Sequence, residues 1–326
     1  MKKTLTTIAL SITGLVAFAQ QDAQFSMNMF NRLAVNPAYA GTNKALCATL
    51  LYRQQWTSFP GAPKTGLLSV DFGQVARGGV GLTVDQDQLG FEKTLKAKLA
   101  YSFHLAVGPG ILGIGLDAGM IQKSIDGTKW LAPDGTSTAT GGGTDQAIPW
   151  GGAAATTYDV GFGLYYTTSK LYVGLSSLHL PEQTLTKSGG AANTPLFYDF
   201  DYKVARHYYV MAGYTFDAGS QFKITPSVLA KSDASSTQVD INILAKWNNM
   251  VFVGASYRLT DAIPVMAGLE WPMKNQKSTL KFGYSYDVTL SAIKNHSNGT
   301  HEIMLGFCQK FAKPEKKQGH MNVRFL

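Results

Sequence analysis

Apolar and polar residues alternate along most of the chain in short segments. Between 208 and 216, for example, Tyr208, Val210, Ala212, Tyr214 and Phe216 fall on one face, with other residue types between them. A period of two predicts β-strands, because successive side chains of a strand point to opposite faces. The segments expected to be strands are 45–55, 65–72, 78–86, 94–105, 111–121, 159–167, 170–177, 206–216, 221–230, 238–247, 250–258, 263–271, 278–286 and 300–311.

The connections between these segments alternate in length. Those after even-numbered segments are short, as at 168–169 and 248–249. Two connections depart from this rhythm, a short one at 259–262 and a longer one at 272–277. The longer odd-numbered connections are 56–64, 122–158, 178–205, 231–237 and 287–299. Transmembrane β-barrels join their strands by short periplasmic turns and long outer loops.

The pattern therefore predicts an all-β protein, an outer-membrane β-barrel of about 14 antiparallel strands with short periplasmic turns and long outer loops. A soluble β-sandwich also has alternating strands. The difference in loop length between the two ends, together with aromatic residues at strand ends, favours the barrel.

The start of the chain is typical of a cleaved secretion signal. Lys2 and Lys3 precede a mostly apolar run from Leu5 to Phe18, and Ala19 ends an A-x-A cleavage site. No apolar run of about eighteen residues occurs elsewhere, so transmembrane helices are not expected. The expected organisation is a signal peptide at 1–19 cleaved near Ala19, an N-terminal periplasmic or plug segment at 20–44, a β-barrel at 45–311 and a basic C-terminal tail at 312–326.

Composition supports this class of protein. The chain has 34 glycines and 15 tyrosines, and only 15% of its residues are charged. The formal net charge of +8 is spread along the chain, without a Lys/Arg run beside aromatic residues, so nucleic acid is not an expected partner.

The motifs that could carry chemistry are unconvincing. A G-x-G-x-x-G pattern at 108–113 is followed by a strand instead of the helix that a dinucleotide site needs, which indicates a hairpin turn. His179 and Glu182 have H-x-x-E spacing, but Pro181 excludes a helix interior and no third metal ligand is apparent. We therefore expect no enzyme activity, no catalytic residues, no cofactor and no metal.

Two cysteines lie on the first and last predicted strands, which are neighbours in a closed barrel. Alternation places Cys47 on the same face as Arg53, and Cys308 on the same face as Lys310, so both thiols are expected to point inward. They either form a disulfide in the oxidising periplasm or remain two separate lumen residues.

The first outer loop is the best candidate for contacting a partner. Two prolines stiffen it, and its aromatic residues are of the kind that dominates protein interfaces. The candidate partner-binding residues are Trp56, Phe59, Pro60, Gly61, Pro63 and Lys64. With the long loops 122–158 and 178–205, this loop is expected to form a cargo-facing surface, whereas Arg53 is expected to join a network in the lumen.

Several short segments together resemble a known family. They are Gln24-Phe-Ser, Met29-Phe-Asn31, Asn36-Pro-Ala-Tyr-Ala-Gly41, Tyr52-Arg-Gln-Gln-Trp56, Phe59-Pro-Gly-Ala-Pro-Lys-Thr65, Ser285-Tyr-Asp287 and His301-Glu-Ile303. The chain resembles the PorP/SprF outer-membrane proteins of the Bacteroidetes type IX secretion system. One departure is Arg32, where the family often has proline.

The resemblance implies an outer-membrane component of that secretion system. Such a barrel would bind secreted adhesins or other cargo through a C-terminal secretion domain, and periplasmic components of the machine. It would support secretion, surface attachment or gliding. The main alternative is an outer-membrane channel for small hydrophobic molecules. A hydrolase in the outer membrane and a soluble secreted β-protein are further alternatives.

Overall fold

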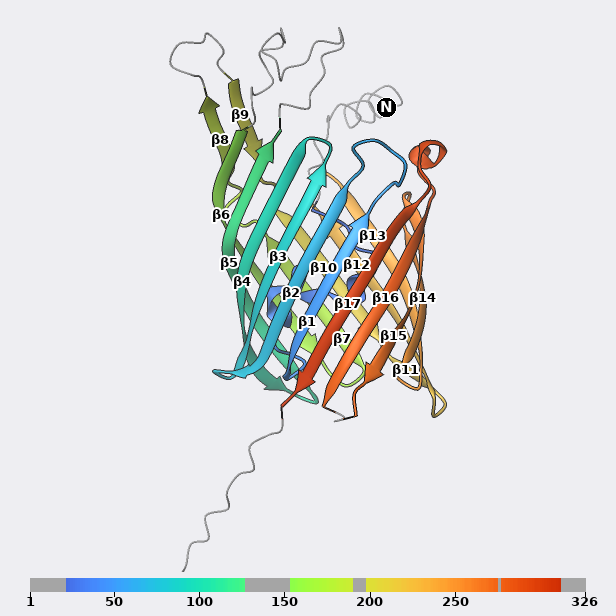
Figure 1. The fold of residues 1–326 in the computed structure, drawn as a ribbon. Helices are drawn as coiled ribbons and strands as arrows, with labels where there is room; N and C mark the ends of the chain where they lie inside the picture. The colour runs from blue at the N-terminus through green and yellow to red at the C-terminus, as the bar shows by residue number, and fades with distance from the viewer. Residues whose placement is uncertain (1–21, 127–152, 190–197, 275–276, 312–326) are drawn as a thin grey trace, which may run out of the picture.

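The computed structural model describes residues 22–126, 153–189, 198–274 and 277–311. Fourteen antiparallel strands close into a barrel, counting β10 and its short continuation β11 as one strand (Figure 1). The barrel closes where β1 pairs with β17. The strands are β1 (Ala45–Gln54), β2 (Lys64–Val75), β3 (Gly78–Leu89), β4 (Glu92–Val107), β5 (Gly110–Ile125), β6 (Ala153–Thr167), β7 (Leu171–Leu178), β8 (Thr184–Gly189), β9 (Tyr198–Lys203), β10 (His207–Tyr214), β11 (Phe216–Ala218), β12 (Phe222–Ser232), β13 (Thr237–Trp247), β14 (Val251–Arg258), β15 (Ala262–Pro272), β16 (Ser278–Thr289) and β17 (Thr300–Lys310).

The barrel wall alternates between an apolar outer face and a largely polar or small inner face. In β17, Ile303 and Leu305 are exposed on the outside, whereas Glu302 and Met304 are fully buried inside. Exposed leucine, valine and aromatic side chains recur in this way on the other barrel strands. Closure leaves no unpaired strand edge, which is what a hydrocarbon environment requires of the backbone. The predicted outer-membrane β-barrel is confirmed.

None of the helices in the described ranges is both long and apolar enough to span a membrane.

The two ends of the barrel differ, as the sequence predicts. One end has tight turns such as 76–77 and 108–109, and the other has longer connections such as 55–63 and 290–299. The longer connections include η6 (Ala292–His296). Two connections at the long-loop end are nevertheless short, at 90–91 and 259–261.

The connection 178–205, predicted as a loop, contains two further strands. Strands β8 and β9 form a hairpin of their own at the long-loop end (Figure 1). Leu185 is buried with Ile121, Ala153 and Val204, so the hairpin has an apolar base where it leaves the barrel. In the other long connection, predicted at 122–158, β5 ends at Ile125 and β6 begins at Ala153, and residues 127–152 lie outside the described residues.

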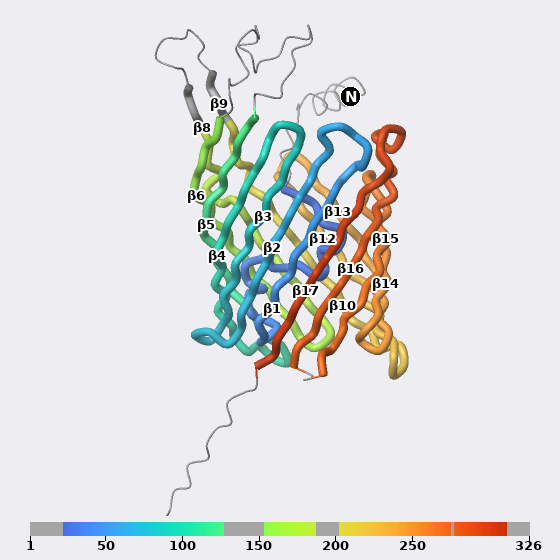
Figure 2. The backbone as a smooth tube through the Cα atoms, viewed as in Figure 1, coloured from blue at the N-terminus to red at the C-terminus, as the bar shows by residue number. Residues whose placement is uncertain are grey.

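An N-terminal segment occupies the barrel lumen. Residues 22–44, which we call the plug, run inside the barrel from the long-loop end to the short-turn end, where β1 begins (Figure 2). The plug contains three single-turn 3-10 helices, η1 (Asn28–Phe30), η2 (Arg32–Ala34) and η3 (Pro37–Tyr39). The segment is thus inside the barrel, and its first described residue is at the outer end. The expected signal peptide and the tail 312–326 lie outside the described residues.

Candidate functional site

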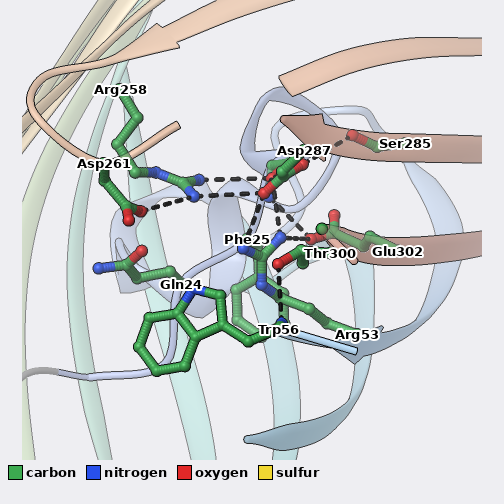
Figure 3. Close-up of polar contacts among 12 residues, drawn as sticks. Gln24, Phe25, Arg53, Trp56, Arg258, Asp261, Ser285, Asp287, Thr300 and Glu302 are labelled. Atoms are coloured by element: carbon green, nitrogen blue, oxygen red, sulfur yellow. Dashed lines mark hydrogen bonds and ion pairs between the residues drawn. The ribbon is translucent and has the colours of Figure 1, made fainter. Parts of the chain in front are cut away.

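A buried ion-pair network fastens the plug to the barrel wall (Figure 3). Arg53 contacts Asp287 at 2.8 Å and Glu302 at 3.0 Å, and all three side chains are at most 2% exposed. Arg53 also donates a hydrogen bond to the hydroxyl of Ser26, which in turn donates to Asp287. The prediction that Arg53 belongs to a lumen network is confirmed.

The carboxylate of Glu302 binds the plug backbone directly. Its two oxygens accept hydrogen bonds from the backbone N–H groups of Ser26 and Met27, each at 2.8 Å. One glutamate thereby satisfies two amide donors and one guanidinium in a region closed to solvent. Buried donors and charges without such partners cost free energy, so the plug and the wall depend on each other here.

A second arginine extends the network along the wall. Arg258 on β14 is fully buried and lies 3.2 Å from Asp240 and 3.4 Å from Asp287. Asp287 is therefore shared between two guanidinium groups, Arg53 and Arg258 (Figure 3). Removing one partner of such a group is strongly destabilising, because it leaves the remaining charges buried and unbalanced.

The motif Asn36-Pro-Ala-Tyr-Ala-Gly41 docks the middle of the plug. The Asn36 side chain caps η3 by accepting a hydrogen bond from the Ala38 N–H at 2.9 Å, and proline suits the first helical position that follows. The Asn36 amide also donates to the backbone carbonyls of Leu164 and Leu175 on the wall. One asparagine thus shapes the plug and attaches it to β6 and β7.

Glycines of the wall make room for this motif. A Cβ on Gly115 would overlap the backbone of Ala38, and a Cβ on Gly163 would overlap the Asn36 side chain. Gly41 has a φ of +72°, and a Cβ there would lie 2.6 Å from the Cα of Gly79. The backbone turn and the close approach both require glycine at 41.

The outer end of the plug is held by a cluster of charged residues. Asp22 lies 2.7 Å from the Lys96 ammonium and 3.1 Å from Nε2 of His179, whose Nδ1 lies 2.8 Å from Asp159. Burial alone would raise the pKa of Asp22, but the charges of Lys96, His179 and His207 lower it well below its usual value. Burial would likewise lower the pKa of His179, and its two carboxylate neighbours raise it instead.

Asp22, His179 and His207 also form a grouping that could in principle bind a metal. One ligand atom from each lies within 4.8 Å of the others. However, Nε2 of His207 accepts the Asp22 N–H at 3.1 Å, and its Nδ1 is 3.0 Å from the carbonyl of Ala205. Asp22 also pairs with the Lys96 ammonium, which Asp85 shares at 3.3 Å. We interpret the cluster as an anchor of the plug.

The two cysteines lie directly opposite each other on β1 and β17. Their Cα atoms are 4.1 Å apart, and a disulfide joins them near the short-turn end.

The first outer loop has a defined shape. The Thr57 N–H donates to the carbonyl of Gly299 at 2.8 Å, and the Asn298 N–H donates back to Thr57 at 2.9 Å. Trp56 adopts a φ of +50°, a conformation that costs a bulky residue about 1–3 kcal/mol. The backbone N–H of Trp56 donates to the Thr300 hydroxyl at 3.1 Å. The loop is therefore held by its neighbour, residues 297–300.

The predicted partner-binding residues differ in accessibility. Phe59, Pro60, Gly61 and Lys64 are exposed, whereas Trp56 and Pro63 are half-buried. Three of them, Phe59, Pro60 and Gly61, are consecutive exposed residues at the long-loop end.

A family model for the type IX secretion system membrane protein PorP/SprF matches residues 17–307. The chain belongs to this family. The PorP/SprF barrel is thus an outer-membrane protein of a secretion system. Four of the seven segments that carry the family resemblance contribute to the network described above. They are the segments that contain Ser26, Arg53, Asp287 and Glu302.

Solved structures of outer-membrane barrels are similar in fold to this PorP/SprF protein. The Ralstonia pickettii toluene transporter TbuX has 12% identity and a TM-score of 0.52, with 86% of this chain and 93% of that chain covered. The Pseudomonas putida toluene transporter TodX has 12% identity and a TM-score of 0.47, with coverage of 86% and 93%. No curated protein sequence matches the chain significantly.

Proposed function

We propose that this PorP/SprF barrel is a closed docking platform of the type IX secretion system. In this proposal it holds secreted cargo, such as an adhesin with a C-terminal secretion domain, at the cell surface, and it contacts other components of the machine. The observation that supports this most is the plug. Residues 22–44 occupy the lumen along its height, and Ser26 and Met27 are held there by hydrogen bonds to a buried ion-pair network of the wall.

The first outer loop is the proposed cargo contact. Phe59 is 42% exposed at its tip, beside Pro60 and Gly61, and Trp56 is half-buried. Pro63 and Lys64 complete the surface at the start of β2. Hydrogen bonds to residues 297–300 hold the loop in one shape, so binding would lose little conformational entropy. A rigid loop with an exposed aromatic residue suits a protein partner.

Affinity purification from the native outer membrane tests this proposal. The full-length protein carries a tag, is extracted in detergent, and its companions are identified by mass spectrometry. We expect surface proteins with secretion domains to accompany the wild type and to be depleted with Phe59→Ala. Leu259→Ala is the matched control, because Leu259 is equally exposed, at 42%, at the same end. Equal recovery of cargo with both variants would refute the role of the loop.

The alternative is a channel for small hydrophobic molecules. The similarity to TbuX, which is described as a toluene transporter, motivates this alternative through the fold alone. A channel would need the plug to leave a path, and would give steady conductance or toluene uptake in reconstituted vesicles. We expect the wild-type barrel to show neither. Uptake of toluene by the wild type, with no cargo in the purification, would favour the channel over docking.

A further inference from the structure

A polar cavity lies between the plug and the short-turn end of the barrel. Its volume is about 600 Å³, within the range of roughly 300–1,000 Å³ that ligand pockets occupy. Its roof is formed by plug residues that include Arg32 and Tyr39, and its rim by turn residues 167–171. We call this cavity the vestibule. Because short turns face the periplasm in such barrels, the vestibule opens to the periplasm.

The lining of the vestibule is strongly basic. Its only carboxylate within the described residues is that of Glu270. Its cationic residues are Arg32, Lys170, Lys223, Lys246, Lys281 and Lys310.

Most of this positive charge is not balanced within the described part of the chain. Glu270 is shared by Lys246 at 2.6 Å and Lys281 at 3.7 Å. Lys170 pairs with Asp217 at the rim, at 2.9 Å. The three remaining cations are Arg32, Lys223 and Lys310, and no carboxylate of a described residue lies within ion-pair distance of them. Asp217, which pairs with Lys170, also lies opposite Lys223 across β11 and β12, so one carboxylate serves two lysines there.

Arg32 is the informative member of this group. Its guanidinium donates to the Tyr165 hydroxyl at 2.8 Å and lies 3.6 Å from the ring centroid of Tyr172. These contacts are neutral, and the Arg32 Nε is buried without a hydrogen-bond partner among the residues described. An arginine stacked on an aromatic ring is held rigidly, with its planar donor edge available for a carboxylate. The first residue of η2 thus brings a fixed, uncompensated charge to the vestibule.

We propose that the vestibule binds an acidic peptide segment of a periplasmic partner protein. The carboxylates of the peptide would lie against Arg32, Lys223 and Lys310 and would supply the negative counter-charge that these cations lack. The opening lies within the ring of turns and inside the barrel wall, which separates it from the surrounding lipid and favours a peptide over a membrane lipid. This inference concerns the opposite end of the barrel from the first outer loop and does not depend on cargo docking there.

A direct binding measurement with the full-length, detergent-solubilised barrel tests the proposal. The probe is a fluorescein-labelled Gly-Glu-Gly-Glu-Gly-Glu peptide, followed by anisotropy, with the corresponding Gly-Gln peptide as a neutral comparison. We expect saturable binding of the glutamate peptide only. The double variant Lys223→Glu/Lys310→Glu should weaken that binding by roughly tenfold or more, because it reverses two charges that face the peptide.

The matched control reverses two exposed lysines at the long-loop end. Lys93→Glu/Lys294→Glu makes the same change in net charge and should leave the Kd unchanged. An equal loss in both double variants, or equal binding of the Gly-Gln peptide, would overturn the proposal. Displacement of the peptide by phosphatidylglycerol vesicles would instead assign the site to an anionic lipid and also overturn it. If the double variant does not insert, Lys223→Gln alone should weaken binding in the same direction, and no change would count against the site.

Discussion

Replacing Glu302 with glutamine should release the plug from the barrel wall. Glu302 is fully buried, and its two oxygens accept from two plug amides at 2.8 Å and from Arg53 at 3.0 Å. Glutamine has nearly the same shape, but one oxygen becomes an NH₂ group. That group cannot accept the hydrogen bond that the replaced oxygen accepted, so one plug amide loses its acceptor, and the ion pair with Arg53 loses its negative charge.

The expected cost follows from these contacts. Leaving a buried donor without an acceptor costs about 1–3 kcal/mol. Removing one member of a buried ion pair costs about 3–5 kcal/mol in total. Barrel closure depends on strand pairing, whereas this anchor holds residues 26–27, so most of the loss should fall on plug docking. At roughly 1.4 kcal/mol per tenfold change, opening of this part of the plug should become roughly a hundred- to a thousand-fold more frequent.

Hydrogen–deuterium exchange of the solubilised protein measures that opening directly. Peptides covering Ser26 and Met27 should lose protection in Glu302→Gln, while the strands of the barrel keep theirs. The control is Asp217→Asn, because Asp217 pairs with Lys170 at 2.9 Å, the two side chains are 47% and 50% exposed, and pairs this exposed contribute little to stability. Unchanged protection at 26–27 in Glu302→Gln, or an equal loss in both variants, would refute the reasoning.

Two other predictions concern the wall of the lumen. Gly115→Ala should loosen the middle of the plug, because the new Cβ overlaps the backbone of Ala38, and overpacking of this kind costs about 1–3 kcal/mol. The control is Gly66→Ala, which should have no such effect because nothing lies within 4 Å of the new Cβ. Equal hydrogen exchange at Ala38 in both variants would contradict this prediction. A non-reducing peptide map of the protein from the outer membrane should recover Cys47 and Cys308 as one linked pair, whereas two free thiols would disprove the disulfide in the cell.

The barrel itself could be predicted because its signal is local. Alternation within each strand and the length of each turn are visible in a short window of sequence, and the fourteen predicted strands match those of the structure closely. The β8–β9 hairpin could not be predicted because its strands are short and the residues that bury its apolar side chain lie far away in the sequence. Leu185 packs against Ile121, which lies on another strand of the wall.

The plug network could not be predicted as a whole. Four of its residues, Ser26, Arg53, Asp287 and Glu302, lie in separate motifs, and only the register of the strands brings them together. Arg258 and Asp240 lie in none of those motifs. The plug has no repeating pattern of its own. Asn36 finds its partners on β6 and β7, so its place depends on contacts far away in the sequence.

The positions of the two cysteines are enough to predict the central ion pair of this network. If Cys47 lies opposite Cys308, antiparallel pairing fixes the register of the first and last strands. Arg53 is six residues after Cys47, and Glu302 is six residues before Cys308, so the two must also lie opposite each other. An inward arginine facing an inward glutamate is an ion pair. The two cysteines therefore determine more than a disulfide, since their register also places the charges that receive the plug.

This geometry links closure of the barrel to docking of the plug. The acceptors for Ser26 lie on β16 and β17, and the arginine that balances them lies on β1. Those groups come together only when the first and last strands pair. A docked plug therefore requires a closed barrel, and it leaves the outer loop and the vestibule as the accessible surfaces at the two ends. On the two proposals made above, such a protein offers its partners two separate faces, with the plug in the lumen between them.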